Sequence, residues 1–168
     1  MKACHALSCR FLVIPLVDNG AVATAAQEDD LVSSLLALRP TMRDTGTAIA
    51  FESDYEPERL ARFIERFPDR DLFGINYDIG NSAALGYSFE RELAAYAPRI
   101  TNVHIKDRVL GGTTVPLGEG AARLPETLNA LRTSGYDGNY ILQTARASDG
   151  DHRGALERYA HLACELLR

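Results

Sequence analysis

The chain is poor in cysteine and has no long hydrophobic run. Its 168 residues include three cysteines, Cys4, Cys9 and Cys164. An odd count without metal-type spacing indicates reduced thiols and a cytoplasmic protein. No apolar run approaches the roughly 20 residues that span a bilayer, so we expect no membrane segment. The run Phe11–Val17 loosely imitates a signal peptide, but Pro15 inside it and Asp18 after it favour a buried strand.

The chain also lacks an excess of positive charge. It has 18 basic and 23 acidic residues, which gives a formal net charge of -5. Proteins that bind nucleic acid need a basic surface against the phosphates, so this balance argues against such a partner. No low-complexity segment or linker interrupts the chain, and its length suits one domain, which we expect to span residues 1–168.

Short β-branched runs alternate with amphipathic helical stretches along the whole chain. The expected strands are apolar at nearly every position, which is typical of parallel strands buried on both faces. They are Phe11–Val17, Thr47–Phe51, Leu72–Tyr77, Ile100–Ile105 and Tyr140–Gln143. This order predicts an α/β fold with about five parallel βα units. The pattern is compatible with an open doubly wound sheet or with part of a (β/α)₈ barrel, which needs roughly 250 residues.

Polar residues follow each expected strand, and three of them suit a metal ion. Glu52, Asp78 and His104 stand at or near the ends of successive strands. Because parallel strands end at one edge of a sheet, these side chains can converge on a divalent metal such as Mn²⁺, Mg²⁺ or Zn²⁺. Each also has a simpler interpretation: Glu52 as a solvated strand end, Asp78 as a cap at Gly80, and His104 as a hydrogen-bonded core residue.

Four segments together resemble the xylose isomerase-like superfamily of sugar-phosphate isomerases and epimerases, including the hexulose-6-phosphate isomerase and L-ribulose-5-phosphate 3-epimerase types. They are YDIGN at 77–81, VHIKD at 103–107, VPLGEG at 115–120 and GYDG at 135–138. The resemblance extends from about Cys4 to the end. It implies a partial (β/α)₈ TIM barrel whose five strands correspond to strands 4–8, without counterparts of strands 1–3.

The resemblance also implies an active site built around a metal. The family's ligands are Glu, Asp, His and Glu, and the matching positions here are Glu52, Asp78, His104 and Gln143. Gln143 departs from the pattern, because an amide can ligate a metal but cannot accept a proton at neutral pH. The family's chemistry implies an enediolate formed from a sugar or sugar phosphate, with Glu52 as the base. Two-base epimerisation is in doubt with Gln143, whereas aldose–ketose isomerisation needs only one base.

Further residues around these strand ends receive supporting roles. Lys106, Arg108 and Arg146 are candidates for binding substrate phosphate or an enediolate, or are solvated surface charges. Asn81 and Ser82 are placed to contact substrate hydroxyls. Asp107 is expected either to orient a metal ligand from behind or to form a structural ion pair. The glycine-rich segment 107–123 is expected to form a mobile flap, and its order of glycines fits no nucleotide-binding loop.

Three functions compete. The first is a metal-dependent isomerase or epimerase. The second is a catalytically impaired remnant or binding subunit, suggested by Gln143 and by the absent strands. The third, an endonuclease of the same superfamily, fits poorly with four histidines and a net charge of -5. Because a partial barrel leaves sheet edges open, we also expect a homo-oligomer, or a partner that carries the other strands.

Overall fold

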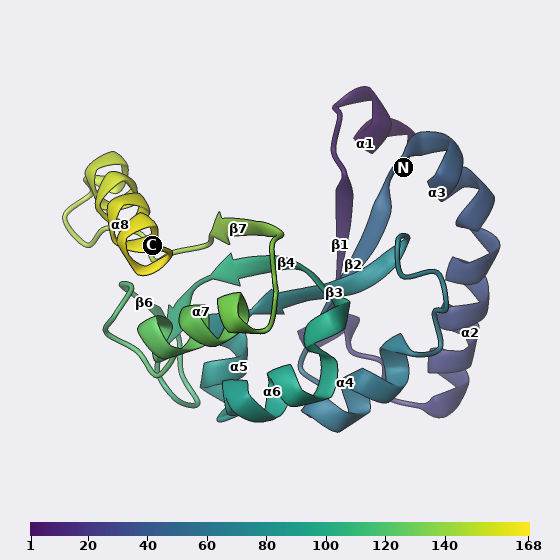
Figure 1. Ribbon diagram of the computed structural model, residues 1–168, viewed down its shortest axis with the longest axis horizontal. Coiled ribbons are helices and arrows are strands. Elements are labelled where there is room, and N and C mark those ends of the chain that lie inside the picture. The colour runs from purple at the N-terminus through teal and green to yellow at the C-terminus, as the bar shows by residue number, and fades with distance from the viewer. The chain divides into compact units, whose positions relative to one another are not determined.

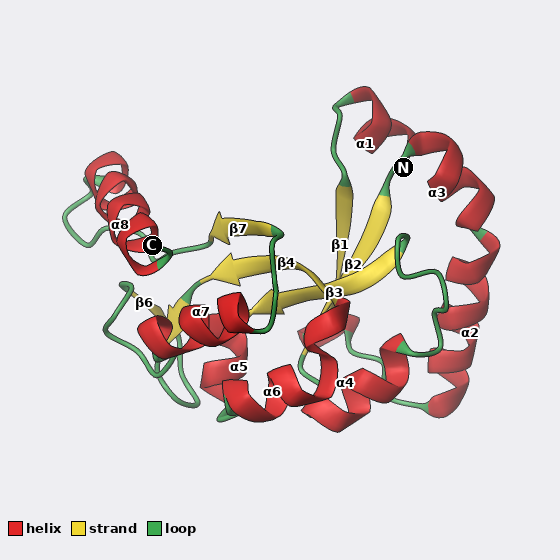
Figure 2. Ribbon diagram, viewed as in Figure 1, coloured by secondary structure: helices red, strands yellow, loops and turns green.

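Helices and strands alternate along the whole chain in the computed structural model, which describes residues 1–168 (Figures 1 and 2). No helix is both long and apolar enough to cross a membrane. The strands are β1 (Phe11–Leu16), β2 (Ala48–Ser53), β3 (Phe73–Asp78), β4 (Ile100–Ile105), β5 (Asp107–Arg108), β6 (Thr114–Val115) and β7 (Asn139–Leu142). The α-helices are α1 (Lys2–Ala6), α2 (Ala25–Ala37), α3 (Arg39–Thr45), α4 (Pro57–Ile64), α5 (Ile79–Leu85), α6 (Phe89–Tyr96), α7 (Leu124–Thr133) and α8 (His152–Leu166). Two short 3₁₀ helices, Asp18–Gly20 and Ala97–Arg99, complete the set.

Five strands form one sheet in the order β1-β2-β3-β4-β7, and β5 and β6 form a separate antiparallel pair. The pairings β1–β2, β2–β3 and β4–β7 are parallel, with Phe11 opposite Ala48 and Asn102 opposite Asn139 as examples. The predicted α/β fold with five parallel strands is therefore confirmed. Each predicted strand overlaps an observed one, and the boundaries differ by no more than two residues.

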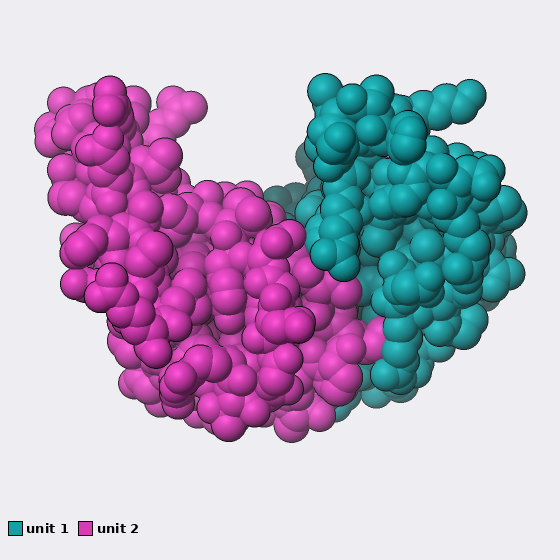
Figure 3. Space-filling view, turned by 45° about the horizontal axis from the view of Figure 1, so that its top comes forward, with its two compact units in different colours: residues 1–76 teal, residues 77–168 magenta.

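The chain divides into two compact units, residues 1–76 and 77–168 (Figure 3). The first unit has a core of packed aromatic rings. The Phe51 ring centroid lies 5.1 Å from that of Phe63, and those of Phe67 and Phe73 lie 4.6 Å apart. All four side chains are fully buried. Helix α4 contributes Phe63 to this core, because Leu60, Phe63 and Ile64 recur at helical spacing along its inner face.

The second unit has an aliphatic core between its strands and helices. Val103 and Ile105 of β4 and Leu128 and Leu131 of α7 are almost completely buried. In Figure 1, α5, α6 and α7 gather on one side of β4. Helix α7 begins with Pro125 in its first turn, as predicted, because proline lacks the N–H that a first turn leaves unpaired.

Local sequence signals explain most helix ends. Ser88 caps α6 by accepting a hydrogen bond from the Arg91 N–H at 3.2 Å. Pro40 stands in the first turn of α3, immediately after α2 ends at Ala37. Helix α5 and the β5–β6 hairpin were not predicted. Both lie in segments that we had treated as turn and loop.

Candidate metal centre

Glu52 lies at the end of β2, one residue before the strand stops. Its Oε2 accepts a hydrogen bond of 2.8 Å from the Asn76 side chain on β3. Asn76 is 2% exposed, so this contact holds the carboxylate from a buried position. The sequence analysis missed Asn76. Alternation along a strand places it on the same face as Asp78, two residues later, and this signal could have identified it.

Asp78 ends β3 and has two roles in the second unit. Its Oδ1 accepts a hydrogen bond of 2.8 Å from the Asn81 backbone N–H and so caps α5. Its Oδ2 faces two basic side chains, with the Lys106 Nζ at 3.3 Å and the His104 Nδ1 at 3.6 Å. The Asp78 side chain is only 1% exposed. A carboxylate at this depth requires such polar partners, because an unpaired buried charge is costly.

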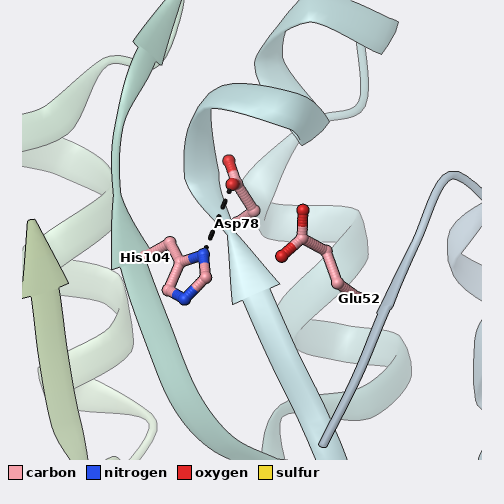
Figure 4. A group of neighbouring side chains, drawn as sticks. All are labelled: Glu52, Asp78 and His104. Carbon is pink, nitrogen blue, oxygen red and sulfur yellow. Dashed lines mark ion pairs between the residues drawn. The ribbon is translucent and has the colours of Figure 1, made fainter. Parts of the chain in front are cut away.

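Three side chains form a candidate metal-binding group. Each of Glu52, Asp78 and His104 offers one ligand atom, and these atoms all lie within 4.8 Å of one another (Figure 4). Figure 4 shows the Asp78 carboxylate at the tip of its strand, with the His104 imidazole on one side and the Glu52 carboxylate on the other. Two carboxylate oxygens and one imidazole nitrogen form a donor set that Mn²⁺, Mg²⁺ and Zn²⁺ accept. The residues present therefore fit a divalent metal.

Lys106 and Arg108 converge on polar groups beside Asp78. The Lys106 ammonium donates to the Gln143 Oε1 at 2.9 Å and to the Asn81 Oδ1 at 3.0 Å. The Arg108 guanidinium also donates to the Asn81 Oδ1, at 3.0 Å. The amide of Gln143 is thus engaged by an ammonium group. This arrangement brings four of the predicted site residues together with Asp78.

Asp107 organises the glycine-rich segment that follows β4. Its buried carboxylate accepts hydrogen bonds from the backbone N–H groups of Gly118, Gly120 and Ala122, at 2.9, 3.0 and 3.1 Å. Gly120 lies so close that an added Cβ would overlap the Asp107 carboxylate. The contacts hold the segment in place, and orientation of a metal ligand by Asp107 stays a prediction.

The remaining predicted residues lie elsewhere in the second unit. Arg146 is exposed and lines a groove of about 530 Å³ beside α8. The Ser82 hydroxyl donates to the buried carboxylate of Glu92 at 2.6 Å. Burial raises the pKa of Glu92 above its ordinary value. Glu92 was not predicted as a site residue, because it lies within a helix and away from the strand ends where the other candidates stand.

Comparison of the sequence with models of protein families shows which family the chain belongs to. Residues 1–164 match the model of the xylose isomerase-like TIM barrel. The chain belongs to that family. It is also 36% identical, over 72 residues, to an L-ribulose-5-phosphate 3-epimerase from Salmonella paratyphi A; the alignment covers 42% of this chain and 25% of the relative. Named family members are sugar epimerases and isomerases, so enzyme function is supported at the level of the family.

Solved structures of low sequence identity share the fold. A xylose isomerase domain protein from Planctomyces limnophilus matches with a TM-score of 0.82 and 21% identity, over 98% of this chain and 62% of that one. The IOLI protein with a bound zinc atom matches at 0.81 and 20%, over 99% and 66%. A xylose isomerase-like TIM barrel protein from Mycobacterium smegmatis, in complex with magnesium, matches at 0.75 and 16%, over 99% and 63%. The chain therefore spans about two thirds of the length of these barrels.

Proposed function

We propose that the chain belongs to a metal-dependent isomerase or epimerase that acts on a sugar or sugar phosphate through an enediolate. The observation that carries this proposal is the group of Glu52, Asp78 and His104, whose candidate ligand atoms lie within 4.8 Å of one another. Membership of the family and the partial match to an L-ribulose-5-phosphate 3-epimerase support the substrate class.

The three residues of this group would hold the metal, and Gln143 would supply a fourth, neutral ligand. When bound, a divalent metal polarises the oxygen atoms of a hydroxyketone and stabilises negative charge on them. Zinc and magnesium in the similar structures support a divalent ion. Gln143 now accepts a hydrogen bond from Lys106, so ligation by its oxygen would require this contact to loosen or to be shared.

Glu52 is the proposed base. Its carboxylate can take the proton from the carbon next to the substrate carbonyl, and the Asn76 amide holds one of its oxygens in a fixed position. A hydrogen bond of 2.8 Å from a buried side chain limits rotation of the carboxylate. Such positioning of the base lowers the entropy cost of proton transfer.

Lys106 and Arg108 are the proposed contacts for negative charge on the substrate. Both donate to the same neutral oxygen of Asn81, and Lys106 also forms an ion pair with the Asp78 carboxylate. An anionic oxygen of the substrate can replace the amide as a stronger acceptor. Arg146 stays a separate candidate for phosphate.

A second candidate function is a catalytically impaired family member that binds sugar without converting it. The observation in its favour is Gln143, which stands where the family's fourth ligand is expected and is engaged by Lys106. An amide cannot return a proton to the opposite face of an enediolate. One-base isomerisation is unaffected by this limit, so the two candidates differ in whether any proton is exchanged.

Proton exchange tests the proposal directly. The chain is incubated with Mn²⁺ and a panel of ketoses and ketose phosphates in D₂O, and deuterium next to the carbonyl is followed by NMR. We expect incorporation by the wild type, a loss of about 10²-fold or more in Glu52→Gln, and no change in Glu58→Gln, an exposed residue of α4. Binding of a sugar without exchange would instead support the impaired family member.

A further inference from the structure

The second unit contains a cavity that the proposed reaction does not use. Its volume is about 220 Å³, and it lies among α5, α6, the start of α7 and the tip of the β5–β6 hairpin. Tyr77, Ser82 and Glu92 line it, and Glu92 is only 2% exposed. Successive residues of a strand face opposite sides, so Tyr77 turns toward the helices while Asp78 turns toward the candidate metal centre.

The carboxylate of Glu92 is surrounded by hydroxyl groups alone. Its Oε2 accepts a hydrogen bond of 2.8 Å from Tyr77, and its Oε1 accepts hydrogen bonds from Ser82 at 2.6 Å and Tyr96 at 2.8 Å. No basic side chain contributes to its electrostatic surroundings. A buried carboxylate without a cation is unusual, since proteins normally pair such a charge.

The polar groups of Tyr77, Ser82 and Glu92 offer the cavity hydrogen-bond acceptors but no free donors. A carboxylate offers about four acceptor positions, and three are taken here. Tyr77 and Ser82 have each donated their single hydroxyl proton to Glu92, so their oxygens are left as acceptors. An occupant must therefore supply N–H or O–H donors, and a positive charge on it would compensate the carboxylate.

The walls limit the size and shape of the occupant. Ile79, Ala83 and Ala122 line the cavity with apolar groups, and Phe89 presents an aromatic ring at its edge. The volume lies below the roughly 300 Å³ at which pockets for drug-sized ligands begin. Arg123 at the rim is already engaged, with its guanidinium 5.0 Å from the Phe89 ring centroid.

We propose that this cavity binds a small organic cation with a primary ammonium group. The ammonium donates to the open acceptor position of Glu92 and to the hydroxyl oxygens of Tyr77 and Ser82, and its short apolar chain lies along the alanine and isoleucine walls. The site is separate from the candidate metal centre, and the proposal holds whichever reaction the chain catalyses.

The test compares three probes on the full chain by calorimetry: propylammonium, the neutral propan-1-ol, and tetramethylammonium, which carries charge without a donor. We expect saturable 1:1 binding of propylammonium, at least about tenfold tighter than that of the other two. No saturable binding to the folded chain, or equal binding of propan-1-ol, would overturn the proposal.

Substitutions of cavity residues test whether propylammonium binds in this cavity. Glu92→Gln should weaken propylammonium binding by about tenfold or more, whereas Glu157→Gln, an exposed residue of α8 that does not line the cavity, should leave it unchanged. Ala83→Leu fills the cavity without altering the carboxylate and should also abolish binding. If circular dichroism shows that Glu92→Gln does not fold, Ala83→Leu decides, and unchanged affinity in that variant contradicts the proposal.

Discussion

At the scale of single residues, the two oxygens of Asp78 contact different groups, and the sequence had offered helix capping and metal ligation as alternatives for this side chain. One carboxylate oxygen caps α5 through the Asn81 N–H, and the other faces Lys106 and His104. The cap is a finding, and metal ligation stays a prediction. Because different oxygens serve the two roles, a substitution can separate them.

Asp78→Asn should preserve the helix cap and remove the charge. Asparagine is as good as aspartate at an N-cap, so thermal unfolding of the metal-free protein should show a stability within about 1 kcal/mol of the wild type. Affinity for Mn²⁺ should fall by at least about tenfold, because a carboxylate ligand is lost. Asp78→Ala serves as the comparison and should lose about 1 kcal/mol more through the missing cap. Equal Mn²⁺ affinity in Asp78→Asn and the wild type would contradict ligation by this residue.

At the scale of elements, hydrogen bonds hold the segment that follows β4. The Asp107 carboxylate draws three backbone N–H groups around itself. At the hairpin tip, the Gly111 N–H donates to the Ala84 carbonyl at the end of α5, at 2.8 Å. The segment is thus held together by Asp107 of β5 and attached to α5, and the closing motion expected from its glycines remains a prediction.

Asp107→Ala should destabilise the protein by about 3 kcal/mol, because three buried N–H groups lose a charged acceptor. Chemical denaturation monitored by circular dichroism measures this change. Asp137→Ala removes an exposed carboxylate and should change the stability by less than about 0.5 kcal/mol. A loss of similar size in both variants would mean that the three hydrogen bonds do not hold the segment.

The elements also show how far the sequence could predict the fold. The main strands were predictable because parallel strands buried on both faces appear as continuous apolar runs. Helix α5 was missed because Asp78 and Gly80 indicated only a turn. Strands β5 and β6 have two residues each, too few for any periodic pattern.

At the scale of the whole molecule, the sheet has β1 and β7 at its edges. Edge strands expose unpaired backbone groups, and Ile141 of β7 is 46% exposed. Pro15 lies on β1 and removes one donor from that edge. The homo-oligomer expected from the sequence stays a prediction that these edges support.

The candidate site was predictable in part because parallel strands end at the same edge of a sheet. Parallel strands brought Glu52, Asp78 and His104 to neighbouring positions, as their places at strand ends had indicated. The partners of these residues were less accessible to sequence reasoning. The contacts of Lys106 with Gln143 and of Asn76 with Glu52 join side chains from different strands, and they depend on rotamers that no sequence pattern specifies.

The central claim is that Glu52, Asp78 and His104 bind one divalent metal, and calorimetric titration with Mn²⁺ and then Zn²⁺ tests it most directly. The wild type should bind one ion per chain, and His104→Ala should lose this binding. His161→Ala, which removes an exposed imidazole of α8, should retain it. Absence of binding by a wild-type chain shown to be folded, or equal affinity in the wild type and His104→Ala, would contradict the account.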